Sequence, residues 1–172
     1  TVGLSIGQGP INTTPLQLAH MAATLATGVK MKPYLIEKVE SSIGNNRSRY
    51  APQDRVTEVD LHPDHREAIL AGMRAALDPV TGTGRRAAHP NYDFGGKTGT
   101  AQVASAAAAG PEEERPEALR NHAWFVGIAP VGEPEIAIAV FIEHGVAGGV
   151  AAAPIAGQLM TAYFEASEET MR

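Results

Sequence analysis

The sequence predicts an α+β domain in which helices pack on an antiparallel sheet. Two apolar segments with strand character, His122–Ala129 and Ile136–Glu143, are separated only by a short turn over Pro130–Pro134, and this spacing favours a hairpin. Segments with apolar residues at helical spacing precede and follow the hairpin. The chain of 172 residues has the length of one ordinary domain.

The first helix is expected over Thr14–Gly28. Thr14 can cap it, Pro15 suits the first helical position, and Gln17 stands where a capping box has its third residue. Its polar residues form one narrow stripe on an otherwise apolar helix, so we expect most of this helix to be buried. The stripe consists of Gln17, His20, Thr24 and Thr27.

The next segments predict a strand, a turn and a second helix. Residues with high β-propensity predict a strand over Pro33–Val39, and Asn45–Ser48 predicts a turn. Apolar residues at helical spacing behind a charged first turn predict an amphipathic helix over Pro63–Leu77. The glycine-rich Thr81–Gly84 predicts a tight loop.

The second half predicts the remaining strands and the last helix. A short strand is expected over Lys97–Val103, followed by a mobile, low-complexity surface loop over Ala104–Glu117. In Ile136–Glu143 the branched residues face one side and the alanines and Phe141 the other. The last helix is expected from about Pro154. The apolar residues of this helix that are expected to pack on the sheet are Ile155, Leu159, Ala162 and Tyr163.

The composition excludes several classes of function. Lys and Arg total 14 against 19 Asp and Glu, a formal charge of −5, which disfavours binding to nucleic acid. The chain contains no Cys, so disulfides, thiolate metal sites and cysteine nucleophiles are excluded, and no cofactor is expected. No apolar run approaches the roughly 20 residues that span a bilayer. Because Thr1–Leu4 resembles no signal peptide and lacks Met, we expect a piece of a longer protein.

The segment Phe94–Gln102 contains a Gly-Gly-Lys-Thr-Gly-Thr run with two competing interpretations. A phosphate-binding P-loop needs Gly at position 91 and a helix directly after Thr98. Position 91 is Asn, and Gly99 follows Thr98 with no helix signal, so the P-loop is disfavoured.

The other interpretation is a Lys-Thr-Gly strand that lines a cleft, as in serine acyl-transferases that bind β-lactams. Acyl transfer passes through an oxyanion, and losing one backbone-type donor to it costs about 3 kcal/mol in a comparable enzyme. Thr98 and Thr100 offer hydroxyls to a carboxylate, and Gly99 lets a substrate approach closely. Strand alternation places the Lys97 charge on the opposite face, so Lys97 shares their site only where the strand borders a seam. A polar tripeptide on an exposed strand is the competing explanation.

Other candidate sites are weaker. His62 and His65 stand three residues apart, but without an evident third ligand they are better explained as solvated histidines than as a zinc site. Trp124 and Phe125 are expected in the core rather than against a substrate. Glu112–Glu114 is expected to be solvated rather than catalytic.

A set of short blocks along the chain resembles the class B penicillin-binding proteins in order and spacing, and most closely the branch that acts in cell elongation and cell shape. The blocks span nearly all of the chain and are more specific together than singly. They are Ile6–Gly9, Thr14–Ala19, Gly82–Gly84, Gly96–Gln102, His122–Gly127 and Glu143–Gly145.

The resemblance implies a partial penicillin-binding transpeptidase fold of the serine β-lactamase-like type. It also implies a periplasmic enzyme, anchored by a membrane segment outside this chain, that cross-links peptidoglycan stem peptides through a serine acyl-enzyme and is blocked by β-lactam antibiotics. In that family the strand that matches Lys97–Gln102 edges the active site and binds substrate, including at Gly99. The matching lysine assists proton transfer, and the residue matching Thr100 provides an oxyanion-hole N–H. The hydroxyls that match Thr98 and Thr100 bind the terminal carboxylate.

The sequence departs from the family in its nucleophile. Neither Ser-x-x-Lys nor Ser-x-Asn occurs in the 172 residues, and the similar Thr27–Lys30 is explained by a helix end with Lys30 near its negative pole. We therefore expect residues 1–172 to be the C-terminal part of a transpeptidase domain, inactive alone. Two roles stay open: part of an enzyme, or a non-catalytic module with the same sheet that recognises β-lactams or is structural. The missing part of the domain is expected to leave apolar surface uncovered, which that part, a partner segment or self-association would cover.

Overall fold

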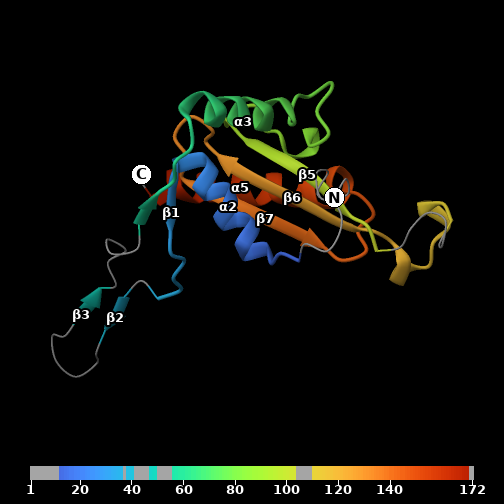
Figure 1. The fold of residues 1–172 in the computed structure, drawn as a ribbon, viewed down its shortest axis with the longest axis horizontal. Helices are drawn as coiled ribbons and strands as arrows, with labels where there is room; N and C mark the ends of the chain where they lie inside the picture. The colour runs from blue at the N-terminus through green and yellow to red at the C-terminus, as the bar shows by residue number, and fades with distance from the viewer. Residues whose placement is uncertain (1–11, 37, 41–46, 50–55, 104–109, 171–172) are drawn as a thin grey trace.

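A three-stranded antiparallel sheet forms the centre of the protein, in the order β5-β6-β7. Its strands are β5 (Gly95–Ala101), β6 (His122–Ala129) and β7 (Ile136–Ile142). The computed structural model describes residues 12–36, 38–40, 47–49, 56–103 and 110–170. The main helices are α2 (Pro15–Thr27), α3 (Pro63–Ala75) and α5 (Ala153–Thr170). Helix α2 crosses one face of the sheet, α5 lies behind the other, and α3 runs beside β5 (Figure 1). This arrangement confirms the predicted α+β class.

Helix α2 begins with the predicted capping box. The amide of Gln17 donates to the Thr14 hydroxyl at 3.2 Å, and the Thr14 amide donates to the Gln17 side-chain oxygen at 2.8 Å. Gly28 ends the helix in the left-handed region, with φ of 74°. The prediction that this helix is mostly buried is wrong. In its range only Ala22 and Ala26 are fully buried, because the helix contacts the sheet through small side chains on one side.

The predicted strand over Pro33–Val39 is wrong for Pro33–Ile36, and only its last residues, Lys38 and Val39, lie in a strand. Strand β1 (Val29–Met31) begins directly after Gly28, and Pro33–Ile36 lies outside any strand, with the Leu35 side chain 98% exposed. Pro33 has no N–H to donate to a ladder, which explains the break.

Two short ribbons replace that strand. β1 pairs with β4 (Val56–Glu58), and β2 (Lys38–Glu40) pairs with β3 (Arg47–Arg49) in a ribbon that projects from the body (Figure 1). Arg47 and Ser48, predicted in a turn, therefore belong to a strand, and Asn45 and Asn46 lie outside the described residues.

Helix α3 matches its prediction to within two residues, and an arginine joins it to α2. The Nε of Arg66 donates to the carbonyls of Leu25 and Ala26 at 3.3 and 3.0 Å, and its Nη2 also donates to Ala26. A guanidinium at these last carbonyls of α2 satisfies acceptors that have no partner within the helix.

The main core lies between the sheet and α5, around the fully buried Phe125. The predicted stripe on α5 is wrong, because Ile155, Leu159 and Tyr163 are 39%, 50% and 38% exposed. Small residues allow a closer approach on another side of the helix, where a Cβ on Gly157 would lie 2.9 Å from the Ala87 Cα. The residues of α5 that are buried against the core are Ala153, Ala156, Gly157 and Met160.

The segment between β5 and β6 is built around a buried charge. Arg115 is 5% exposed and forms an ion pair with Glu112, whose carboxylate also accepts the Asn121 amide at 2.7 Å. Glu112 therefore departs from the expected solvated segment, since a buried guanidinium requires a carboxylate partner, whereas Glu114 is exposed as expected. The predicted Ala104–Glu117 loop contains a short 3₁₀ turn at Glu112–Glu114, and residues 104–109 lie outside the described residues. Within the described part of the chain, no helix combines the length and hydropathy needed to cross a membrane.

Candidate active site

The central feature of the site is the edge strand β5. Within the described residues, β5 is hydrogen-bonded to β6 alone, with Lys97 opposite Val126, Thr98 opposite Phe125, Gly99 opposite Trp124 and Thr100 opposite Ala123. Directly opposed residues share a face of an antiparallel pair. Thr98 and Thr100 therefore face the α5 side with Phe125, and Lys97 faces the α2 side with Val126, as strand alternation predicts.

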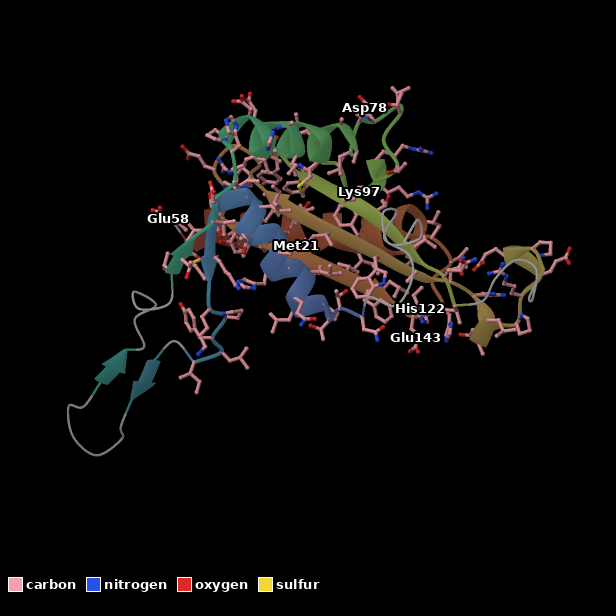
Figure 2. All side chains as sticks on the ribbon, viewed as in Figure 1. Met21, Glu58, Asp78, Lys97, His122 and Glu143 are labelled. Atoms are coloured by element: carbon pink, nitrogen blue, oxygen red, sulfur yellow. The ribbon has the colours of Figure 1, made fainter. Side chains whose placement is uncertain are left out.

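An apolar groove of about 840 Å³ lies on the α2 side of β5. Its apolar lining comes from α2, α3 and the sheet. It includes Met21, Leu25, Ile69, Met73, Trp124 and Phe141. Trp124, expected in the core, is instead half-buried in this lining, with its ring centroid 4.4 Å from that of Phe141. Figure 2 labels Met21 on α2 and Lys97 on β5, which both line the groove.

A polar groove of about 490 Å³ lies on the other side of the same strand. Its lining combines three segments: the loop at Thr83–Arg86, the rim residues 97–100 of β5, and the residues 147–150. Residues 97–100 line both grooves, so we call them the rim. The rim is therefore a seam, at which Lys97, Thr98 and Thr100 border the same two grooves although their side chains leave opposite faces.

Lys97 is exposed, and its Nζ donates to the carbonyl of the neighbouring Thr98 at 2.7 Å. Its ammonium therefore lies against the rim backbone although the side chain is exposed. The Thr98 hydroxyl lies 3.0 Å from the hydroxyl of Thr83, which ties the glycine-rich loop to β5.

The loop that carries Thr83 is held by Asp78. The Asp78 carboxylate accepts hydrogen bonds from the Thr81 amide at 2.7 Å, the Thr81 hydroxyl at 2.8 Å and the Val80 amide at 3.0 Å. These bonds, led by the one from the Thr81 amide, hold the pKa of Asp78 below its ordinary value. The buried Gly84 then returns to α3, donating to the Ala76 carbonyl at 2.8 Å. The loop therefore has a fixed shape, as the glycine pattern predicts.

The third wall, residues 147–150, is close to β5 because it contains glycines. A Cβ on Gly148 would lie 2.5 Å from the Gly99 carbonyl oxygen and would also meet the Trp124 carbonyl. A Cβ on Gly149 would collide with the Thr83 carbonyl. These positions therefore require glycine for steric reasons, and the wall presents backbone to the groove.

Two histidines fix the turn that leads into this wall. The His144 amide donates to His122 Nδ1 at 3.0 Å, and His144 Nδ1 lies 3.1 Å from the Arg120 carbonyl. His144 has φ of 53° and Val146 has φ of 69°, so the turn is held in a conformation that side chains disfavour. Figure 2 shows His122 and Glu143 together at the end of the sheet where β6 begins and β7 ends.

The structure brings together four of the five predicted site residues. Lys97, Thr98, Gly99 and Thr100 are adjacent on the rim, whereas the exposed Gln102 follows β5 and lines neither groove. Sequence reasoning did not assign the other polar-groove residues. The Gly82–Gly84 block and the adjacent Gly148 and Gly149 are the signals that could have indicated backbone close to a site. The unassigned residues are Thr83, Arg85, Arg86, Gly148 and Gly149. Hydroxyls beside cations are groups that can bind a carboxylate.

Comparison with known proteins places the chain in a family. Residues 2–161 match the family profile described as the penicillin binding protein transpeptidase domain. Peptidoglycan D,D-transpeptidase MrdA of Acinetobacter baumannii is 39% identical over 157 residues, covering 88% of this chain and 22% of that protein.

Solved structures of penicillin-binding proteins are also similar to this chain. Penicillin-binding protein 2 of Pseudomonas aeruginosa, in complex with WCK 5153, superposes with a TM-score of 0.66 at 31% identity, covering 93% of this chain and 31% of that one. The ceftriaxone acyl-enzyme of penicillin-binding protein A from Mycobacterium tuberculosis superposes with a TM-score of 0.69 at 28% identity, covering 92% of this chain and 34% of that one. The chain thus spans about a quarter of the length of its curated relatives and about a third of these solved chains.

Proposed function

Since this chain belongs to the penicillin-binding protein transpeptidase family, we propose that it forms the substrate-binding part of a peptidoglycan D,D-transpeptidase of the penicillin-binding protein 2 type. One observation carries the proposal: the Lys97–Thr100 rim borders both grooves. An extended edge strand with a lysine on one face and hydroxyls on the other suits a peptide bound along it.

The proposed reaction is acyl transfer through a serine carried outside these 172 residues. The serine oxygen attacks the carbonyl of the penultimate D-residue, the amide C–N bond breaks, and the terminal residue leaves as an amine that has gained a proton. The amine of a second stem peptide then attacks the ester carbonyl, loses a proton and returns the serine hydroxyl.

Each rim residue has a role in this proposal. Lys97 assists the proton transfers and lowers the energy of negative charge near the serine, since its ammonium is held at the seam. The hydroxyls of Thr98 and Thr100 hold the terminal carboxylate, Gly99 gives the peptide close access, and the Thr100 amide donates to the oxyanion. Gln102 extends the binding strand beyond the grooves.

The proposed ligands are peptidoglycan stem peptides and β-lactam antibiotics, which mimic them. A relative of known structure forms an acyl-enzyme with ceftriaxone, and this supports β-lactams as ligands here. The proposed location is the periplasmic face of the inner membrane, through an anchor outside this chain.

Labelled penicillin tests the proposal. The 172-residue chain should not form a stable acyl-enzyme, whereas a longer chain that adds a Ser-x-x-Lys segment should. In the longer chain, Lys97→Ala should lower the acylation rate at least about 100-fold, because proton transfer loses its partner. Lys30→Ala, which removes an exposed charge on β1, is the matched control and should leave the rate unchanged.

Two results would contradict the proposal: stable acylation of the 172-residue chain, or equal acylation rates for Lys97→Ala and Lys30→Ala.

The coding sequence upstream of Thr1 decides whether the chain is part of an enzyme or a non-catalytic module. Ser-x-x-Lys followed by Ser-x-Asn supports the enzyme, and their absence from the full gene product supports a non-catalytic module that recognises β-lactams.

A further inference from the structure

The glycine-rich loop presents the side chain of Thr83 to the rim. The Thr83 hydroxyl lies 3.0 Å from the Thr98 hydroxyl, and either oxygen can be the donor. The residues on both sides of Thr83 are buried, and the amides of Gly82 and Gly84 donate to carbonyls just beyond α3 at 2.9 and 2.8 Å. The opposite wall lies against the Thr83 carbonyl at Gly149. The backbone of Thr83 is therefore fixed, and its exposed side chain lies beside Thr98.

The direction of this hydrogen bond follows from the number of protons once a carboxylate is bound. Each threonine hydroxyl has one proton, whereas an ionised carboxylate has none and can only accept. If Thr98 donates its proton to a ligand carboxylate, it cannot also donate to Thr83, so Thr83 has to be the donor to Thr98. In the reverse arrangement the Thr98 proton points at Thr83, and the Thr98 lone pairs repel the ligand.

The lining of the polar groove permits the productive direction. Among the described residues that line this groove none is Asp or Glu, so no side-chain carboxylate of the lining competes with Thr98 for the Thr83 proton. A hydroxyl that accepts one hydrogen bond becomes a stronger donor for the next, because chains of hydrogen bonds polarise one another. A hydrogen bond from Thr83 to Thr98 therefore strengthens the one from Thr98 to a carboxylate.

We infer that Thr83 is a positioning residue for the substrate carboxylate. Its hydroxyl donates to Thr98, and this directs the Thr98 proton into the polar groove, where the carboxylate binds. Thr83 acts through Thr98 and not on the reacting atoms. This inference rests on the proposed function, because it assumes that Thr98 holds the carboxylate.

Benzylpenicillin tests the inference in the longer chain that adds a Ser-x-x-Lys segment. The acylation rate is measured over a range of penicillin concentrations, which separates the dissociation constant of the noncovalent complex from the limiting rate. Thr83→Val removes the hydroxyl and keeps the branched shape of the side chain. It should raise the dissociation constant about threefold to tenfold, as expected for one lost hydrogen bond. The limiting rate should stay within about twofold, because the carboxylate is held equally before and during acyl transfer.

Two further variants assign the effect to this hydroxyl. Thr83→Ser keeps the hydroxyl and should retain most of the affinity. Thr57→Val removes an exposed hydroxyl on β4, outside both grooves, and is the matched control. It should leave both the dissociation constant and the limiting rate unchanged.

A double-mutant cycle tests whether Thr83 acts through Thr98. Thr98→Val alone should raise the dissociation constant at least as much as Thr83→Val does. In a chain that already carries Thr98→Val, adding Thr83→Val should change the dissociation constant by less than about twofold, because the group that Thr83 positions is gone. An effect that came only from the structure of the loop would persist in that chain.

The outcomes separate this inference from the proposed function. If Thr98→Val weakens binding and Thr83→Val does not, the inference is wrong and the proposed function stands. An effect of Thr83→Val that is equally large in the Thr98→Val chain, or that lies only in the limiting rate, also overturns the inference. If Thr98→Val leaves the dissociation constant unchanged, or if the unmodified longer chain forms no acyl-enzyme, the proposed function itself is wrong and the inference falls with it.

Discussion

Asp93 is a single residue that joins three segments. Its carboxylate accepts hydrogen bonds from Arg74 Nε at 2.8 Å and Arg74 Nη2 at 2.6 Å, and from the Gly132 amide at 3.2 Å. It thereby links α3, the approach to β5 and the turn between β6 and β7. The hydrogen bonds from Arg74 are the main reason that the pKa of Asp93 lies below its ordinary value.

Stability should depend on the ionisation of Asp93. Its pKa is lower in the folded chain, so the pair contributes fully above the unfolded pKa of about 3.9 and is lost as pH falls through the folded pKa. Both side chains are over 40% exposed, and solvent screening limits the contribution to about 0.5–1 kcal/mol at pH 7. Urea unfolding of the chain and of Asp93→Asn should show this difference at pH 7 and a smaller one at about pH 3, below the unfolded pKa.

Asp60→Asn, at an exposed position before α3, is the control and should leave the free energy of unfolding nearly unchanged. A difference between the chain and Asp93→Asn that is the same at both pH values would show that the ion pair is not its cause.

At the scale of elements, the distance between the 147–150 wall and β5 decides the width of the polar groove. Backbone carbonyls of Gly99 and Trp124 occupy the space that a side chain at Gly148 would need. Backbone in a sheet yields less readily than the end of a flexible side chain, so the wall depends on glycine. Gly72 in α3 is the opposite case, since a Cβ there would meet nothing within 4 Å.

Gly148→Ala and Gly72→Ala should therefore change stability in opposite directions. Gly148→Ala should lower the free energy of unfolding by about 1–3 kcal/mol, because the wall must move away from β5. Gly72→Ala should raise it by up to about 1 kcal/mol, because alanine is the better helix former. Urea unfolding of the two variants measures both effects. A Gly148→Ala chain as stable as the original would show that the wall is not packed against β5.

For the whole molecule, the apolar groove is a large apolar feature that no described residue covers. It holds about 840 Å³ between α2, α3 and the sheet, and its lining includes the 47% exposed Met21. Contiguous apolar surface of this kind marks an interaction site or a tendency to associate. The sequence-based expectation of self-association or of a covering segment therefore concerns this groove.

We predict that the 172-residue chain self-associates through the apolar groove. Met21→Lys should shift the chain toward monomer in sedimentation velocity, because a charge in the groove disfavours burial of its apolar lining. Leu35→Lys changes a leucine that is 98% exposed and lies outside the groove, so it should leave association unchanged. A chain that stays monomeric at high concentration, or equal effects of the two variants, would contradict the prediction.

Local signals determined much of the fold. The capping box and Gly28 set the ends of α2, and the apolar strand segments on either side of the Pro130–Pro134 turn gave the limits of β6 and β7 to within one residue. These features depend on neighbours in the chain, so sequence alone reveals them. The stripe of α5 and the burial of α2 were mispredicted because both depend on which small residues let another element approach, a property of the packed pair.

The candidate site divides in the same way. The Lys97–Thr100 motif was recognisable from the sequence because its residues are consecutive in one strand. The sequence did not reveal the other residues of the polar groove, because the loop before β5 and the turn after β7 meet the rim only when the chain folds. These residues include Thr83, Arg85, Arg86 and Gly148. The sequence by itself determines functional groups that are consecutive in one strand. The charge and shape of a groove depend on segments that are distant along the chain, so tertiary packing decides them.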